Sequence, residues 1–392
     1  RFIVLITTLD LVVFALDSTY HVARVSANNV TIHGFTFSGA TEDTGIDPQQ
    51  SGIYLTGVNY CNISNNILKG NRNGISSSES HKNRICNNTS TDNRINGIDV
   101  LFSNSNKITE NVVTNNLIYG IFIRDSNDNE VSRNKIRNNT SSVGYPSGGN
   151  AITVTGDGNE IVENEIISNY RGGVTGAGDG IELNYADNNL VKRNVLRKNW
   201  GGIIIAHSNH NSICNNFISS STKIEGNPHV GIWLMCDELS AFPHCEHNTV
   251  ENNTICLNEI GLRLEYSNHT VIFHNNFMDN TKQAQLQVSG LLGWYNVMLD
   301  NDYPSGGNYW SDYAGVDLYS GSYQNETGSD GIGDTPYIVD ENNNDRYPLM
   351  NSTSSIQHGP TAVFTEKPEA SFVGDIVTFD PSRSMHGCNG TH

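Results

Sequence analysis

The chain repeats itself every 22 or 23 residues over much of its length, and this period restricts the fold more than any other feature. Four consecutive units begin at Gly52, Gly74, Gly97 and Gly120, so their starts lie 22, 23 and 23 residues apart. Five further units begin at Ala151, Gly180, Gly202, Gly231 and Gly261. One unit is too short to bury its own apolar face, so the period predicts a solenoid in which neighbouring units share a core.

Apolar residues stand at the same positions in each unit. An apolar residue follows the first residue and another stands two places later, as Ile121 and Ile123 do after Gly120. Period-two alternation places both side chains on one face of a short β-strand. A second apolar column contains Ile63, Ile85, Ile108, Val131, Ile161, Val191, Ile213, Val250 and Phe273. A third contains Leu68, Val113, Ile136, Ile166, Leu196, Ile218, Ile255 and Met278.

Asparagine is the other recurring residue, with 54 among the 392 positions. One asparagine follows the unit start by 14 residues in six of the nine units. This column contains Asn66, Asn88, Asn111, Asn134, Asn164, Asn194, Asn216, Asn253 and Asn276. Asparagine tolerates left-handed backbone, and its amide can bond to the amide of the next unit. We therefore predict a structural asparagine ladder at a tight bend.

These columns predict an all-β chain folded as a parallel β-helix of about ten or more coils. Right-handed winding is expected, because parallel crossovers have this hand. The Leu-rich consensus of leucine-rich repeats is absent, and Ile and Val prevail instead. We expect the β-helix at residues 1–290, a cap rich in Trp, Tyr and Asp at 291–353, and a linker at 354–360.

The units resemble the right-handed β-helix repeats of the NosD-like and carbohydrate-binding/sugar-hydrolase group over residues 22–290. The segments GNYWSDYAG (307–315) and SDGIGDTPYIVDENNNDRYPLM (329–350) are similar to the one that closes many NosD-like surface proteins of methanogenic archaea. The resemblance implies an aromatic cap over the last coil, and a sugar-stacking platform is the alternative. Residues 361–392 resemble the opening strands of a PKD-type immunoglobulin-like β-sandwich module, which would be incomplete.

Charge and processing signals indicate where such a chain acts. The net charge of −18 disfavours nucleic acid as a partner, and no apolar run is long enough to span a membrane. Cys236 and Cys245 are predicted to form a disulfide in an oxidising compartment. We expect an extracellular or cell-surface glycoprotein. Its Asn-x-Ser/Thr acceptors are Asn29, Asn62, Asn87, Asn88, Asn138, Asn139, Asn252, Asn268, Asn325, Asn351 and Asn389.

Two sets of side chains could bind metal ions. Closely spaced carboxylates near the C-terminus suggest calcium, which would be the only cofactor. They are Asp330, Asp334, Asp340 and Asp345. Scattered histidines would serve a copper-handling role by resemblance to NosD. They are His207, His210, His229, His244 and His247.

The acidic motifs of known polysaccharide-cleaving β-helices are missing, so we predict no catalytic residue. The nearest approach to such a constellation contains Asp157, Arg171, Asp179 and Glu182. The favoured function is a non-enzymatic, adhesive rod that associates with itself into an envelope, sheath or filament. The alternatives are a β-helix that binds or cleaves a cell-surface polysaccharide and a NosD-like copper-handling protein.

Overall fold

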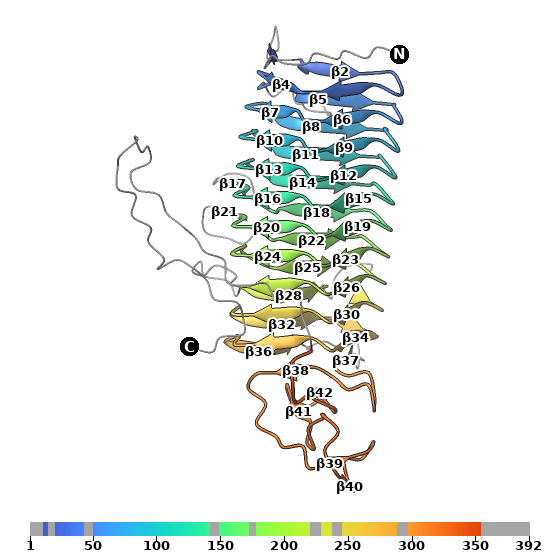
Figure 1. The fold of residues 1–392 in the computed structure, drawn as a ribbon, viewed down its shortest axis with the longest axis vertical. Helices are drawn as coiled ribbons and strands as arrows, with labels where there is room; N and C mark the ends of the chain where they lie inside the picture. The colour runs from blue at the N-terminus through green and yellow to red at the C-terminus, as the bar shows by residue number, and fades with distance from the viewer. Residues whose placement is uncertain are drawn as a thin grey trace, which may run out of the picture.

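The computed structural model describes residues 11–14, 20–42, 50–141, 149–171, 178–219, 229–236, 245–287 and 297–353, and their regular structure is entirely β. Three long parallel sheets of 12, 11 and 11 strands run side by side along one axis (Figure 1). Each coil contributes one strand to each sheet. The parallel β-helix predicted from the repeat is therefore confirmed.

Each strand inside these sheets pairs in parallel with its equivalents in the coils before and after it. Sheet A contains β1 (Leu11–Phe14), β4 (Phe35–Ser38), β7 (Ile67–Lys69), β10 (Thr89–Thr91), β13 (Val112–Thr114), β16 (Lys135–Arg137), β20 (Glu165–Ile167), β24 (Val195–Arg197), β27 (Phe217–Ser219), β31 (Thr254–Cys256), β35 (Asn276–Met278) and β38 (Tyr309–Trp310). Sheet B contains β2 (Ala23–Val25), β5 (Ser51–Thr56), β8 (Asn73–Ser78), β11 (Asn96–Leu101), β14 (Tyr119–Arg124), β18 (Ile152–Thr155), β22 (Ile181–Asn184), β25 (Ile203–Ala206), β28 (Val230–Met235), β32 (Ile260–Glu265) and β36 (Lys282–Gln287).

Sheet C completes each coil. It contains β3 (Thr31–His33), β6 (Asn62–Ser64), β9 (Arg84–Cys86), β12 (Lys107–Thr109), β15 (Glu130–Ser132), β19 (Glu160–Val162), β23 (Leu190–Lys192), β26 (Ser212–Cys214), β30 (Thr249–Glu251), β34 (Thr270–Phe273) and β37 (Val297–Met298). Four two-stranded pairs lie outside these sheets. They are β17 (Thr140–Ser141) with β21 (Tyr170–Arg171), β29 (Cys245–Glu246) with β33 (Ser267–Asn268), β39 (Tyr319–Ser320) with β40 (Glu326–Thr327), and β41 (Tyr337–Ile338) with β42 (Asn344–Asp345).

The core consists of apolar ladders that run through successive coils. Ile98 of β11 pairs in register with Ile121 of β14, and both side chains are completely buried. β-branched residues stack well on a pleated surface, so the repeating Ile and Val side chains fill the interior. One coil departs from the predicted columns. Ile272 and Phe277 point inward, rather than Phe273 and Met278, because this coil lies one residue out of the assumed register.

The predicted asparagine ladder forms, with one correction. The Nδ2 group of Asn134 donates to Oδ1 of Asn164 at 3.0 Å and to the carbonyl of Ile108 at 2.8 Å. The ladder passes from Asn253 to Asn275 and then to Asn308, so the assignment of Asn276 to the column was wrong.

Spacing explains the correction, because Asn275 is the residue that lies 14 positions after Gly261. Asn276 instead accepts a hydrogen bond from the backbone N–H of Thr353 at 2.8 Å. Its side chain therefore ties the C-terminal segment to the helix.

Further asparagine ladders occupy the other bends of the coil. One contains Asn83, Asn106, Asn129, Asn159, Asn189, Asn211 and Asn248. Another contains Asn71, Asn93, Asn116, Asn139, Asn169 and Asn199. Two of the predicted glycosylation acceptors, Asn88 and Asn139, are buried members of these ladders. A glycan on either residue would displace the neighbouring amides, so the prediction that Asn88 and Asn139 are glycosylated was wrong.

Glycine opens most units because the next coil leaves no room for a side chain. A Cβ atom on Gly97 would lie 2.6 Å from the carbonyl oxygen of Gly120 and 2.3 Å from Cγ1 of Val113. The glycine column therefore records a close approach between neighbouring coils.

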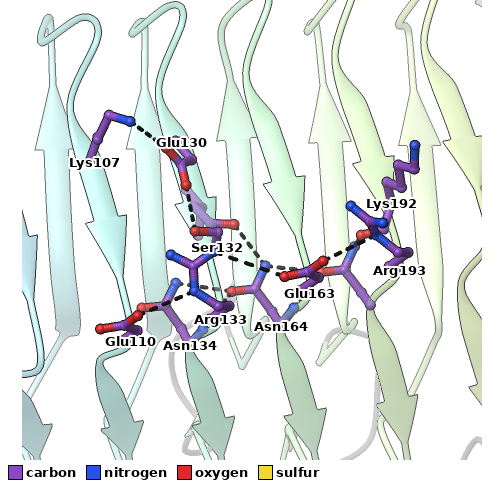
Figure 2. A network of polar contacts seen from close by, with 12 residues as sticks. Lys107, Glu110, Glu130, Ser132, Arg133, Asn134, Glu163, Asn164, Lys192 and Arg193 are labelled. Atoms are coloured by element: carbon purple, nitrogen blue, oxygen red, sulfur yellow. Dashed lines mark hydrogen bonds and ion pairs between the residues drawn. The ribbon is translucent and has the colours of Figure 1, made fainter.

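Opposite charges alternate along one outer edge of sheet C (Figure 2). Arg133 lies between Glu110 and Glu163 of the adjacent coils, at N···O distances of 3.3 and 3.9 Å. Glu163 in turn contacts Arg193 at 3.2 Å. Exposed pairs of this kind each contribute only about 0–1 kcal/mol to stability. The core and the amide ladders therefore set the register of the coils, and the ion pairs add a little to it.

The C-terminal segment covers the last coil, at the orange and red end of the axis (Figure 1). Trp310 is buried between Phe277 and Tyr337, with ring centroids 4.4 and 4.3 Å away. The indole Nε1–H donates to the buried carboxyl of Asp345 at 2.9 Å. Because only 1% of Trp310 is exposed, this ring is part of the core and unsuited to stacking on a sugar.

Burial raises the pKa of Asp345 to about 7, although N–H groups of Asn308, Trp310 and Tyr347 hydrogen-bond to it and oppose the rise. Since the folded-state pKa exceeds the unfolded value, the stability tied to this proton is complete below about pH 4 and lost as the pH rises through 7. We expect denaturant unfolding to show Asp345→Asn losing less stability than wild type between pH 5 and pH 8. An equal loss in both proteins would contradict this assignment.

Several expectations lie outside the described residues. They are the linker at 354–360, the β-sandwich segment at 361–392, the acceptor Asn389 and the histidine His244. In the part of the chain described above, no helix has the length and apolarity needed to cross a membrane.

Candidate functional site

The outward-facing residues of sheet B form a continuous row, here called the outer row. It contains Arg24, Tyr54, Ser76, Asp99, Phe122, Thr153, Glu182, Ile204, Trp233, Arg263 and Gln285. Each residue lies between two inward-facing positions of its strand, so the pleat that builds the core also aligns this row. Neighbouring members stand about 4.8 Å apart along the axis, which is close to the length of one sugar unit.

Two carboxyl groups lie near the middle of the outer row. Glu182 on β22 accepts hydrogen bonds from Nδ2 of Asn150 at 2.7 Å and from the hydroxyl of Thr153 at 3.3 Å. Asp179, three residues earlier, is held by its backbone N–H, which donates to Oδ1 of Asn150 at 2.9 Å. Asn150 therefore positions both acids.

The Asp179 carboxyl is buried, and its Oδ1 atom has no hydrogen-bond partner. It lies against Gly201, where a Cβ atom would come within 2.2 Å of Oδ1. An unpaired buried carboxyl oxygen is costly, and native proteins rarely keep one without a functional reason. This position is therefore a strong candidate for chemistry.

The environment favours the protonated form of Asp179. Burial raises its pKa well above the usual range, and the nearby Glu182 carboxyl raises it further. Burial also raises the pKa of Glu182, but hydrogen bonds from Thr153, Asn150 and Asn184 oppose that rise. Asp179 is thus suited to donate a proton, and Glu182 to remain the carboxylate.

Similar groups flank the acids on both sides. Arg124 lies over the ring of Phe122, 5.4 Å from its centroid, and donates to both carboxylate oxygens of Asp99 at 3.0 and 2.8 Å. On the other side, Arg263 lies 4.7 Å from the Trp233 centroid. Glu265 accepts hydrogen bonds from both Arg263 and Trp233, at 2.5 and 3.2 Å. Each flank therefore offers a half-buried aromatic ring beside a paired arginine.

The structure brings together only part of the constellation expected from sequence. Asp179 and Glu182 adjoin, but Asp157 is an exposed corner residue whose Oδ1 accepts the backbone N–H of Asp187 at 2.8 Å. The side chain of Arg171 lies outside the described residues. The sequence analysis missed Asn150, Phe122 and Trp233. Phe122 and Trp233 could have been found, because each lies between two inward-facing Ile or Leu residues of its strand, which is the position that defines the outer row.

A second cluster lies at the bend before sheet C. Glu246, His247 and His269 each place a potential metal-ligating atom so that all three lie within 4.8 Å of one another. The His247 ring stacks on His210 and on His269, with centroids 5.0 and 4.9 Å away. Two of the predicted histidines, His210 and His247, therefore meet, and His269 joins them from the next coil.

Two further predicted histidines, His207 and His229, lie elsewhere. His207 stacks on Tyr185 with centroids 4.8 Å apart, and His229 is buried with Nδ1 3.1 Å from the carbonyl of Trp200. His269 was missed although it lies 22 residues after His247, one repeat further along the chain.

The predicted disulfide pair lies beside this cluster. The sulfur atoms of Cys236 and Cys245 are 2.6 Å apart, as two buried thiols. A disulfide between them stays a prediction.

The four aspartates proposed for calcium do not converge. Asp330, Asp340 and Asp345 each accept the backbone N–H of the residue two positions later. Asp334 instead accepts the backbone N–H groups of Leu318 and Tyr319. Within the described residues, no three of these carboxyl groups bring oxygens within 4.8 Å of one another. Calcium binding stays a prediction without a geometric basis here.

One family model matches the chain over most of its length. The family model described as "Periplasmic copper-binding protein (NosD)" matches residues 16–175 and 172–315. No curated protein matches the chain.

Solved structures share the architecture. The A-module of mannuronan C-5 epimerase AlgE6 from Azotobacter vinelandii is 12% identical, with a TM-score of 0.44 over 71% of this chain and 78% of that one. The DFA-IIIase from Arthrobacter chlorophenolicus A6 is 15% identical, with a TM-score of 0.47 over 68% and 69%. The periplasmic alginate epimerase AlgG is 16% identical, with a TM-score of 0.42 over 66% and 69%. The likeness is one of fold, the right-handed parallel β-helix.

Proposed function

The chain belongs to the NosD family, and from its geometry we propose that it is a carbohydrate-active β-helix protein. The partly exposed members of the outer row, among them Phe122 and Trp233, bind a polysaccharide along the helix axis, and Asp179 with Glu182 cleaves a glycosidic bond. The observation that carries this proposal is the buried, unpaired carboxyl of Asp179 beside a hydrogen-bonded Glu182.

The two acids divide the reaction between them. The protonated carboxyl of Asp179 gives its proton to the leaving glycosidic oxygen as the bond to the anomeric carbon breaks. The Glu182 carboxylate takes a proton from the water whose oxygen joins that carbon. Asp179 loses one proton and Glu182 gains one, so the protons balance. Proton exchange with solvent then returns Asp179 to its acid form and Glu182 to its carboxylate form.

The flanking rings support a polymer as the ligand. Phe122 and Trp233 each lie two coils from Glu182, at roughly 10 Å along the axis. Aromatic rings stack on the apolar faces of sugars, so these residues would hold units on either side of the cleaved bond. Assembly into a rod or filament stays a prediction.

A location outside the cytoplasm is part of the proposal. The description of the family places its named member in the periplasm. We further propose that the protein is secreted to the cell surface, where exposed Asn-x-Ser/Thr acceptors can be glycosylated. These acceptors are Asn29, Asn87, Asn138, Asn325 and Asn351.

The test is digestion and binding with glucans, fructans and polyuronates. Asp179→Asn and Glu182→Gln are expected to lower the release of new chain ends by about 10²- to 10⁴-fold while binding persists. Trp233→Ala should weaken binding by about tenfold. Glu160→Gln, an exposed carboxyl on neighbouring β19, is the matched control and should behave as wild type. Failure of the wild type to bind or cleave any of these polymers would refute the proposal, as would full activity of Asp179→Asn.

A further inference from the structure

The family description implies copper, and the histidine cluster at the bend before sheet C is where this chain has residues that suit it. Imidazole and carboxylate ligands suit Cu²⁺ and Zn²⁺, whereas magnesium and calcium prefer oxygen alone. We propose that Glu246, His247 and His269 form a site for one such divalent ion. This site lies apart from the outer row.

The backbone places the three ligands without help from the ion. Glu246 ends β29, which pairs with β33, so Glu246 lies directly opposite Asn268. His247 and His269 follow these two residues at equivalent positions of adjacent coils, and the N–H of His247 donates to the carbonyl of Asn268 at 3.2 Å. The coil repeat therefore fixes the separation of the two imidazoles.

Backbone conformation keeps both rings directed the same way. His210, His247 and His269 all have left-handed backbone, with φ values of 56°, 55° and 48°. The rings are nearly parallel, with interplanar angles of 1° between His210 and His247 and 9° between His247 and His269. Parallel rings on successive coils present equivalent nitrogen atoms side by side.

The spacing of the ligand atoms is compatible with one ion. Ligands on a tetrahedral ion with bonds near 2.1 Å stand about 3.4 Å apart, and the three atoms already lie within 4.8 Å of one another. Both rings are exposed, so a small rotation closes the difference. His210, stacked against His247 from the preceding coil, is placed to supply a third imidazole.

An ion bound here would join two adjacent coils. Glu246 and His247 precede β30 of one coil, and His269 precedes β34 of the next. The site would therefore stabilise this bend, because it binds the folded arrangement and not the unfolded chain.

The test uses the whole chain, stripped with a chelator and titrated with CuCl₂ and ZnCl₂ separately. Calorimetry is expected to show one ion per chain, and Cu²⁺ should give an electron paramagnetic resonance spectrum with nitrogen coupling from at least two imidazoles. His247→Ala and His269→Ala should each weaken binding by about tenfold or more. His33→Ala, at the exposed histidine that ends β3, is the matched control and should bind as wild type.

Two outcomes would overturn the proposal. One is that the His247→Ala/His269→Ala double variant binds either ion as tightly as wild type. The other is that binding depends on the neighbouring thiols, so that Cys245→Ser abolishes it while the histidine variants keep it. Because polysaccharide cleavage is measured separately, loss of metal binding leaves the assignment of Asp179 and Glu182 unaffected.

Discussion

Trp310→Ala is expected to release the C-terminal cap from the β-helix. Truncation of a buried tryptophan costs about 3–5 kcal/mol, and here it removes two stacked ring contacts together. It also takes away the indole N–H that bonds Asp345, which leaves a buried carboxyl with one donor fewer. Solenoid coils contact mainly their neighbours, so the coils before the cap should stay folded.

Limited proteolysis with mass spectrometry measures this effect directly. We expect rapid cleavage within residues 311–353 in Trp310→Ala and protection of the preceding coils. Trp310→Phe keeps the stacking but loses the hydrogen bond, so it should cost only about 1–3 kcal/mol. Tyr323→Ala, at a cap residue that is 85% exposed, is the control. Wild-type protection of the cap in Trp310→Ala would show that the stacked rings do not hold it.

Asn134→Ala should destabilise the middle of the β-helix by about 3–5 kcal/mol. Oδ1 of Asn134 accepts the backbone N–H and the Nδ2 group of Asn111 at 2.9 and 3.0 Å, and its own Nδ2 group bonds Asn164 and Ile108. Alanine cannot replace these bonds, and the site is too buried for water to reach freely. Polar groups in both neighbouring coils would lose a partner at once.

Equilibrium unfolding in guanidinium, followed by circular dichroism, measures the loss. Asn66→Ala, near the start of the same ladder, should cost less, because its Oδ1 accepts only the N–H of Phe35 from the preceding coil. Asn342→Ala, at an exposed cap residue, should change stability by less than about 0.5 kcal/mol. If Asn134→Ala unfolds at the same denaturant concentration as wild type, the ladder does not contribute to stability as argued.

Residue spacing was a reliable guide wherever the repeat stayed regular. Ile98 and Ile121 could be placed in the core from period-two alternation alone, because every coil imposes the same inward positions. The assignment failed by one residue at Asn276, although the 14-residue spacing from Gly261 selects the adjacent Asn275. The structure separates them, since only Asn275 faces the amide of Asn253.

The candidate sites were less predictable, because each depends on residues from different coils. Asp179 and Glu182 are close in sequence, but nothing in their spacing shows that Asn150 holds both of them or that one oxygen has no partner. His269 became visible as a ligand only when stacking placed it beside His247.

The sequence by itself determined the β-helix, the inward Ile and Val ladders and the main asparagine column, because a strict repeat forces equivalent residues into equivalent places. Only the tertiary structure decided which polar side chains meet on the outside. The outward residues differ from coil to coil, so which of them become neighbours depends on the register in which the coils stack. Burial, which raises the pKa of Asp179 and seals Trp310 under the cap, likewise arises from the packed arrangement of the whole chain.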